Sequence, residues 1–357
     1  MPVETIPPSP GGGGRWVRIV ARALAAAAIV AATAWGAGLI GFQLPGAPSS
    51  RGALIALWCA LGIASAVALG LRRTAMRKPA LAAFAAGFAA LLAWWLSLAP
   101  SHHRDWADDV ARLLDAQVSG DRVVLRNVRN FEWRSETDYT PRWETREYDL
   151  SRLSSADLVL SYWMGPDIAH TLVSFGFDDG RRVVFSLEIR KERGESFSAL
   201  GGFFRRYEQV LVAADERDIV RTRSNARGED VYLYRLNIPP RTLRPMFLGF
   251  LAKAGALQRE PAFYNTLTSN CTTVVFEIAR HVVPDLPLDY RLLAAGHFAE
   301  YVYDRGGLTP GYSYSQLHER GYINPRALAV PADADAGAFS RAIRRGVPGV
   351  PAAETAP

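Results

Sequence analysis

The chain has 357 residues, of which 49% are hydrophobic and 21% charged, and its formal net charge is +6. This length allows one large domain or two ordinary ones. Only two cysteines are present, which excludes a disulfide framework and a cysteine-only structural zinc site. The composition is uneven, because the first hundred residues are mostly apolar and most acidic residues follow Trp106. The chain is therefore neither a wholly soluble protein nor a transporter filled with membrane spans.

Three apolar stretches lie near the N-terminus, at residues 23–42, 53–71 and 80–99, and none has a charge in its interior. Each approaches the roughly 20 residues that an α-helix needs to cross a bilayer. The alternative is an alanine-rich buried hairpin, but such helices seldom lack a polar stripe. We predict three transmembrane helices within residues 23–99, after a disordered cytoplasmic leader at 1–22.

The orientation of these spans follows from the basic residues beside them. They precede the first span and fill the loop between the second and third: Arg15, Arg18, Arg22, Arg72, Arg73, Arg77 and Lys78. The loop between the first and second spans has only Arg51. The positive-inside rule then places the N-terminus in the cytoplasm, and an odd number of spans places the rest outside. We predict a bacterial inner-membrane protein with a periplasmic domain at 106–346 and a disordered tail at 347–357.

The segment after Trp106 mixes both kinds of secondary structure. Helical patterns fall at 107–117, 242–257, 270–283 and 338–345, and strand patterns at 121–128, 157–163, 170–177, 182–190 and 230–237. Asp179-Gly180 is typical of a hairpin turn between two of these strands. Residues 131–148 are expected to form a long loop or a strand with exposed aromatics, and 203–212 a helix or irregular structure. The pattern predicts one α+β domain with an antiparallel sheet.

Cys271 is the first candidate for chemistry, because an unpaired thiol is unusual in an oxidising compartment. Asn270 or Ser269 is a suitable helix cap, which puts Cys271 in the first helical turn. The amides and dipole at that end stabilise a thiolate. The alternative is that Cys271 is a small buried apolar residue, as most free cysteines are.

A thiol nucleophile needs a base, and His170 is the preferred candidate. His281 lies on the predicted helix of Cys271, roughly 15 Å away, which is too far for a hydrogen bond. His170 instead opens a strand whose hairpin partner carries Glu188, and a turn at Asp179-Gly180 pairs His170 near Ile189, within one residue of Glu188. That carboxylate can orient the imidazole. Alternatively, Glu188 forms a surface ion pair with Arg190 or Lys191.

Several of these tracts together resemble a known family. They are Ser161–Trp163, Ile168–Thr171, Ser174–Phe177, Ser186–Lys191, Gly202–Glu208, Asp215–Asp218 and Tyr264–Thr273. Over about residues 121–345 the chain resembles the bacterial family that shares the N-terminal periplasmic domain of the lipoprotein N-acyltransferase Lnb. The resemblance implies a circularly permuted papain-like (NlpC/P60-like) fold, with Cys271 as nucleophile and His170 as base. The orienting role of Glu188 comes from strand pairing alone. In Lnb the spans follow the thiol domain, whereas here they precede it.

The resulting hypothesis is a membrane-anchored thiol acyltransferase or hydrolase that forms a thioester and acts on phospholipid or lipoprotein acyl groups. The expected partners are inner-membrane lipids and lipoproteins, and the arginines among residues 205–227 either attract phosphate headgroups or form a solvated basic face. One alternative is a papain-like peptidase or amidase acting on cell-wall peptides, and another is a non-catalytic binding domain. No cofactor, metal or nucleic acid is expected, since the sequence has no short ligand spacing and no basic helix.

Overall fold

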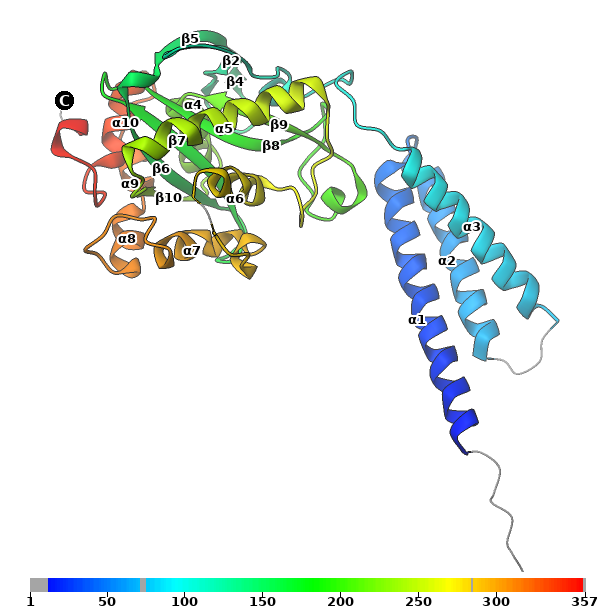
Figure 1. The fold of residues 1–357 in the computed structure, drawn as a ribbon. Coiled ribbons are helices and arrows are strands. Elements are labelled where there is room, and N and C mark those ends of the chain that lie inside the picture. The colour runs from blue at the N-terminus through cyan, green and yellow to red at the C-terminus, as the bar shows by residue number, and fades with distance from the viewer. Residues whose placement is uncertain (1–11, 71–74, 284, 356–357) are drawn as a thin grey trace, which may run out of the picture. The chain divides into compact units, whose positions relative to one another are not determined.

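The computed structural model describes residues 12–70, 75–283 and 285–355 (Figure 1). The chain forms two compact units. The first comprises the N-terminal part up to Ala99 with Phe204–Arg206, and the second comprises Pro100–Phe203 and the chain from Tyr207 onward. The predicted leader lies outside the described residues as far as residue 11, and the chain is helical from Gly12.

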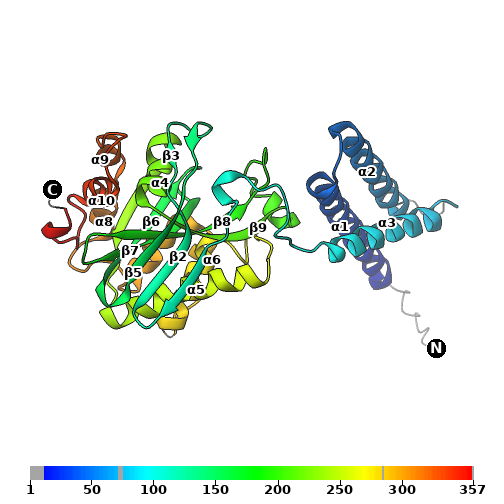
Figure 2. The ribbon, with the colours of Figure 1, turned by 90° about the horizontal axis from the view of Figure 1, so that it is seen from above.

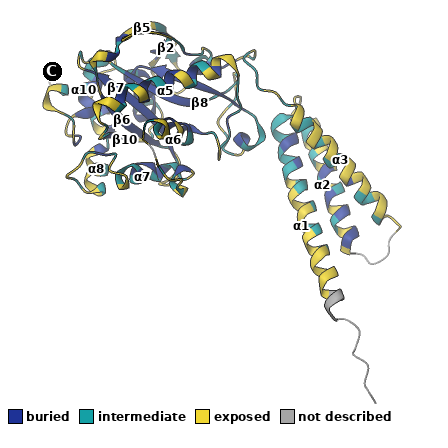
Figure 3. Cartoon of the chain, viewed as in Figure 1, coloured by how far each residue is buried: buried dark blue, intermediate teal, exposed yellow. Residues whose placement is uncertain are grey.

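Within the described residues, the first unit has three helices long and apolar enough to cross a membrane: α1 (Gly12–Gln43), α2 (Pro48–Gly70) and α3 (Arg77–Ser97). Their contacts are close, because Trp58 stacks on Phe84 at 4.8 Å and donates a hydrogen bond to the carbonyl of Thr33 at 2.9 Å. A Cβ at Gly62 would lie 2.1 Å from the Thr33 hydroxyl, so only glycine fits there. Most of the remaining helix surface is exposed (Figure 3), as expected for residues that face lipid.

The second unit is built on a sheet of eight strands in the described part of the chain, in the order β1-β2-β9-β8-β7-β6-β10, with β5 also paired to β2. The strands are β1 (Asp115–Ser119), β2 (Arg122–Arg129), β5 (Trp143–Asp149), β6 (Leu153–Tyr162), β7 (Ala169–Phe177), β8 (Arg182–Arg190), β9 (Glu208–Ala214) and β10 (Asp230–Arg235). A separate small hairpin pairs β3 (Glu132–Trp133) with β4 (Tyr139–Thr140). The α+β class is confirmed, but the sheet is mixed, because β2 and β9 pair in parallel through Arg129 and Ala214.

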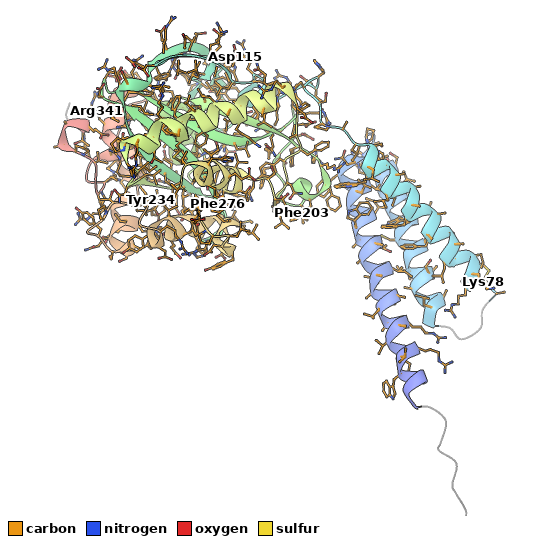
Figure 4. The ribbon with its side chains drawn as sticks, viewed as in Figure 1. Lys78, Asp115, Phe203, Tyr234, Phe276 and Arg341 are labelled. Carbon is orange, nitrogen blue, oxygen red and sulfur yellow. The ribbon has the colours of Figure 1, made fainter. Side chains whose placement is uncertain are left out.

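Helices cover both faces of this sheet (Figures 1 and 2). They are α4 (Glu216–Arg221), α5 (Pro240–Arg259), α6 (Cys271–Val282), α7 (Phe298–Asp304), α8 (Tyr314–Gly321), α9 (Asn324–Leu328) and α10 (Ala336–Arg344). A hydrophobic core lies on each face of the sheet, and side chains of β7 point into both. Phe175 packs with the side chains of α5 and α6, and Leu172 packs with those of α4, α9 and α10. Figure 4 shows the side chains, with Phe276 labelled on α6 and Arg341 on α10.

Two predicted elements are wrong. The helix expected at 107–117 is a short 3₁₀ turn, Asp108–Val110, followed by β1, where Asp115 faces Arg126 of β2 and pairs with it at 2.8 Å. Residues 203–212, expected to be helical or irregular, contain most of β9. All residues of β9 are buried, because the strand lies inside the sheet and its side chains pack into hydrophobic clusters on both faces. A strand covered on both faces has no alternating pattern, which explains why the sequence did not reveal it.

The C-terminal part of the second unit is anchored by buried charges. Arg344 of α10 is fully buried and pairs with Asp157 at 2.7 Å and Glu216 at 2.5 Å. We predicted a disordered tail at 347–357, but the described residues of this tail include a 3₁₀ turn, Ala352–Glu354. The Glu354 carboxylate pairs with Arg235 at 2.7 Å, so the chain remains ordered beyond α10.

Candidate active site

Cys271 is the first residue of α6, as predicted, and a capping box fixes this helix start. The Asn270 side-chain oxygen accepts hydrogen bonds from the amides of Thr272 and Thr273, both at 2.9 Å, and the Asn270 amide donates to the Thr273 hydroxyl at 2.8 Å. Cys271 therefore has a defined backbone position at the positive end of the helix dipole, which favours a thiolate over a thiol.

His170 lies where two neighbouring strands part. Pairing between β7 and β8 ends at Leu172 and Ser186, whereas β7 stays paired with β6 as far as Ala169. Two residues beyond the last pair, His170 and Glu188 approach each other, with 3.2 Å between imidazole Nε2 and Glu188 Oε1. The turn had predicted a partner at Ile189 or one residue away, and the structure places Glu188 there.

Ser186, which the sequence did not single out, links this pair. Its hydroxyl donates to Glu188 Oε1 at 2.8 Å and lies 2.6 Å from His170 Nε2. A hydroxyl that donates its own hydrogen to the carboxylate can only accept a hydrogen bond from the imidazole, so Nε2 carries hydrogen. Nδ1 is then the ring nitrogen left for the thiol. In the sequence, Ser186 is marked as a site residue only by its position on β8, two residues before Glu188.

The structure brings Cys271 and His170 together. The residues that follow them, Thr272 and Thr171, share a hydrogen bond of 2.8 Å that ties α6 to β7 beside the pair. Burial raises the pKa of the Cys271 thiol, but the charge of His170 and a hydrogen bond with it outweigh burial and lower the pKa below its ordinary value. Burial lowers the pKa of His170, but Glu188 and Cys271 together raise the pKa to about 9. Both shifts favour a thiolate–imidazolium pair at neutral pH.

Arg223 completes the site and was also missed as a site residue. It lies on a π-helical turn, Thr222–Ala226, and donates from Nη2 to Glu188 Oε1 at 2.7 Å. Its exposed fraction is only 4%, so it is no member of a solvated basic face. Burial raises the pKa of Glu188, but the charges of His170 and Arg223 hold the pKa well below its ordinary value. Glu188 therefore stays ionised, and the alternative in which it pairs with Arg190 or Lys191 is wrong.

The site opens into a cavity of about 1260 Å³, lined by Cys271, His170, Glu188, Tyr264 and Arg223 among others. This volume exceeds the roughly 300–1,000 Å³ of pockets for drug-sized ligands. Burial raises the pKa of Tyr264, and the charges of Cys271 and Glu188 raise it further. Tyr264 therefore keeps its proton and presents a hydroxyl donor in the wall of the cavity that contains Cys271.

Two other histidines of the second unit have partners of their own. His281 is exposed on α6, with its Nδ1 2.7 Å from the carbonyl of Glu277. His297 lines the same cavity as Cys271 but pairs with Asp167 at 2.8 Å and Glu300 at 3.2 Å. Within residues 12–70, 75–283 and 285–355, no three His, Cys, Asp or Glu side chains are grouped so that they can hold a metal ion.

Comparison with known proteins gives a match to a family model. Residues 139–296 match the family model of the Lnb N-terminal periplasmic domain. The match contains His170, Ser186, Glu188, Arg223 and Cys271. It confirms over these residues the resemblance predicted from the sequence. No curated protein and no solved structure matches the chain.

Proposed function

We propose that the chain is a membrane-anchored thiol acyltransferase or hydrolase in which Cys271 is the nucleophile and His170 the base. The observation that carries the proposal is that Cys271 and His170 lie together in the wall of a large cavity, where a hydrogen bond between the residues that follow them ties α6 to β7. The imidazole is in turn held by Ser186 and Glu188. A nucleophile, a base and a group that orients the base are the recurring parts of covalent acyl transfer.

In the first step, the Cys271 thiolate attacks the carbonyl carbon of an acyl ester. A carbon–sulfur bond forms, the carbon–oxygen bond to the alcohol breaks, and the imidazolium of His170 gives its proton to the departing alkoxide. The negative oxygen of the tetrahedral intermediate needs hydrogen-bond donors. Tyr264, in the wall of the same cavity, supplies a protonated hydroxyl, and the start of α6 supplies the backbone amide of Cys271.

In the second step, an amine or a water molecule attacks the thioester. Neutral His170 takes a proton from the attacking nitrogen or oxygen, the new bond to the acyl carbon forms, and the carbon–sulfur bond breaks. Cys271 leaves as the thiolate, which restores the ion pair. Transfer and hydrolysis thus differ only in the acceptor.

The substrates in this proposal are phospholipid or lipoprotein acyl groups at the periplasmic face of the inner membrane. Three candidate membrane helices and the match to a periplasmic domain support that location. The fold is taken to be a circular permutation of the papain-like arrangement, because the histidine strand β7 precedes the cysteine helix α6 along the chain.

Incubating the full-length protein with phospholipid and measuring the intact protein mass tests this proposal. We expect an added acyl mass on Cys271 that hydroxylamine removes, and no such mass on Cys271→Ala or in a lipid-free sample. Release of cell-wall peptides without any lipid change would favour the peptidase alternative. Absence of both reactions would contradict an enzymatic role.

A further inference from the structure

Large apolar side chains are exposed where the active-site cavity opens. Trp163, Met164, Phe197 and Leu293 all line the cavity, yet their exposed fractions are 41%, 53%, 42% and 56%. Side chains that line the cavity and keep exposed fractions this large are accessible to solvent, as residues at its opening are. We call these four side chains the apolar rim.

The apolar rim is assembled from three separate connections of the second unit. Trp163 and Met164 follow β6, Phe197 lies between β8 and β9, and Leu293 follows the 3₁₀ turn Tyr290–Leu292. The rings of Trp163 and Phe197 meet edge to face at 5.1 Å, so two of the connections are joined through the rim itself. Such a contact gives the rim a defined shape.

The apolar surface continues beyond the four rim residues. Leu200 and Leu267 are 64% and 46% exposed, and their chain neighbours Ala199 and Thr266 line the cavity. Single exposed apolar residues are ordinary, but several gathered around one cavity mark an interaction surface. Tryptophan, together with long apolar side chains, is the composition found at bilayer interfaces.

The short connection between α3 and the second unit indicates that a membrane is the partner of the apolar rim. Helix α3 ends at Ser97, and the amide of Ser101 already donates to Glu208 of β9 at 3.0 Å. Leu98, Ala99 and Pro100 are the only residues between Ser97 and Ser101, and the four steps along the backbone span about 14 Å at most. A bilayer that holds α3 is therefore always near the second unit, at a high effective concentration.

We propose that the apolar rim is a membrane-docking surface that inserts into the interface of the adjacent leaflet and connects the cavity with its lipids. The cavity then receives a lipid chain without its passing through water. The membrane contact does not depend on the thiol chemistry. The further statement that the rim brings an acyl group to Cys271 rests on the proposed function.

Environment-sensitive labelling of the full-length protein in phospholipid nanodiscs tests this inference. The background is Cys59→Ala with Cys271→Ala, so a single introduced cysteine carries the fluorophore NBD and no thiol chemistry is involved. The rim positions are Met164→Cys and Leu293→Cys. The matched control is Leu328→Cys on α9, which is 61% exposed but does not line the cavity. Circular dichroism equal to the wild type verifies that each labelled protein is folded.

We expect NBD at both rim positions to emit at shorter wavelength in nanodiscs and to lose intensity when doxyl-labelled phospholipid is included. NBD at residue 328 should keep its aqueous emission and resist quenching. Aqueous emission at the rim positions, or equal quenching at residue 328, would overturn the inference. Because Cys271 is absent from every labelled protein, these outcomes are separate from the acyl-adduct result that tests the proposed function.

Discussion

Replacing Cys271 with alanine is expected to slow turnover of an acyl ester by about 10⁴-fold or more, because no other group in the site can form the thioester. His170→Ala should cause a loss of similar size, since the thiol then lacks both its counter-ion and its proton carrier. Initial rates with p-nitrophenyl butyrate, a soluble ester, measure both effects. The double variant should be no slower than either single variant, because residues that act as a unit are not additive.

Two substitutions serve as matched controls for this experiment. Cys59→Ala changes the other cysteine, which lies in α2, and His281→Ala changes the exposed histidine of α6. Both should keep the wild-type rate. Retention of the wild-type rate by Cys271→Ala would show that the ester is cleaved elsewhere.

Arg344→Met is expected to reduce the free energy of unfolding of the second unit by roughly 3–5 kcal/mol, because it leaves buried carboxylates without their cation. Arg344 is fully buried between Asp157 and Glu216, and methionine restores the apolar volume but not the charge. In a domain of this size, the thermal midpoint should fall by roughly 6–20 °C. Thermal unfolding of the full-length protein at pH 7 measures the change.

Arg341→Met is the control for that experiment, because Arg341 lies on the same helix but is partly exposed. It should shift the midpoint little.

The pH dependence of the unfolding midpoint adds a second check. Burial raises the pKa of Asp157, but Arg344, Arg235 and Arg182 outweigh it and lower the pKa to about 2. The stabilisation from Asp157 should therefore be complete above its unfolded pKa near 4 and be lost as the pH falls towards 2. Equal midpoints for the two variants at pH 7 would contradict this account.

Much of the fold could be predicted from local patterns. The Asp179-Gly180 turn set the β7–β8 hairpin, with Gly180 at a positive φ of 82°, and alternation defined both strands. Asn270 predicted the start of α6, because an asparagine side chain can cap a helix. Strand β9 could not be predicted, since its burial on both faces follows from neighbours that are distant in sequence.

The residues of the candidate site also divide into those that the sequence predicts and those that it does not. His170 and Glu188 could be paired by counting from a turn, to within one residue. Arg223 could not be found in this way, because it is 35 residues from Glu188 in the sequence. The π-helical turn that carries Arg223 has no pattern that predicts it. Among many arginines, only burial distinguishes this one, and burial is a property of the folded chain.

The central claim is that Cys271 is a thiolate paired with the imidazolium of His170, and the pH dependence of its alkylation tests this most directly. In Cys59→Ala protein, the rate of reaction with iodoacetamide follows the thiolate fraction of Cys271. We expect the midpoint of this rise to lie below the ordinary thiol value of about 8.5. The ion pair should persist to about pH 9, where the imidazolium loses its proton. His170→Ala should move the midpoint upward. A wild-type midpoint at or above 8.5, unchanged by His170→Ala, would contradict the account.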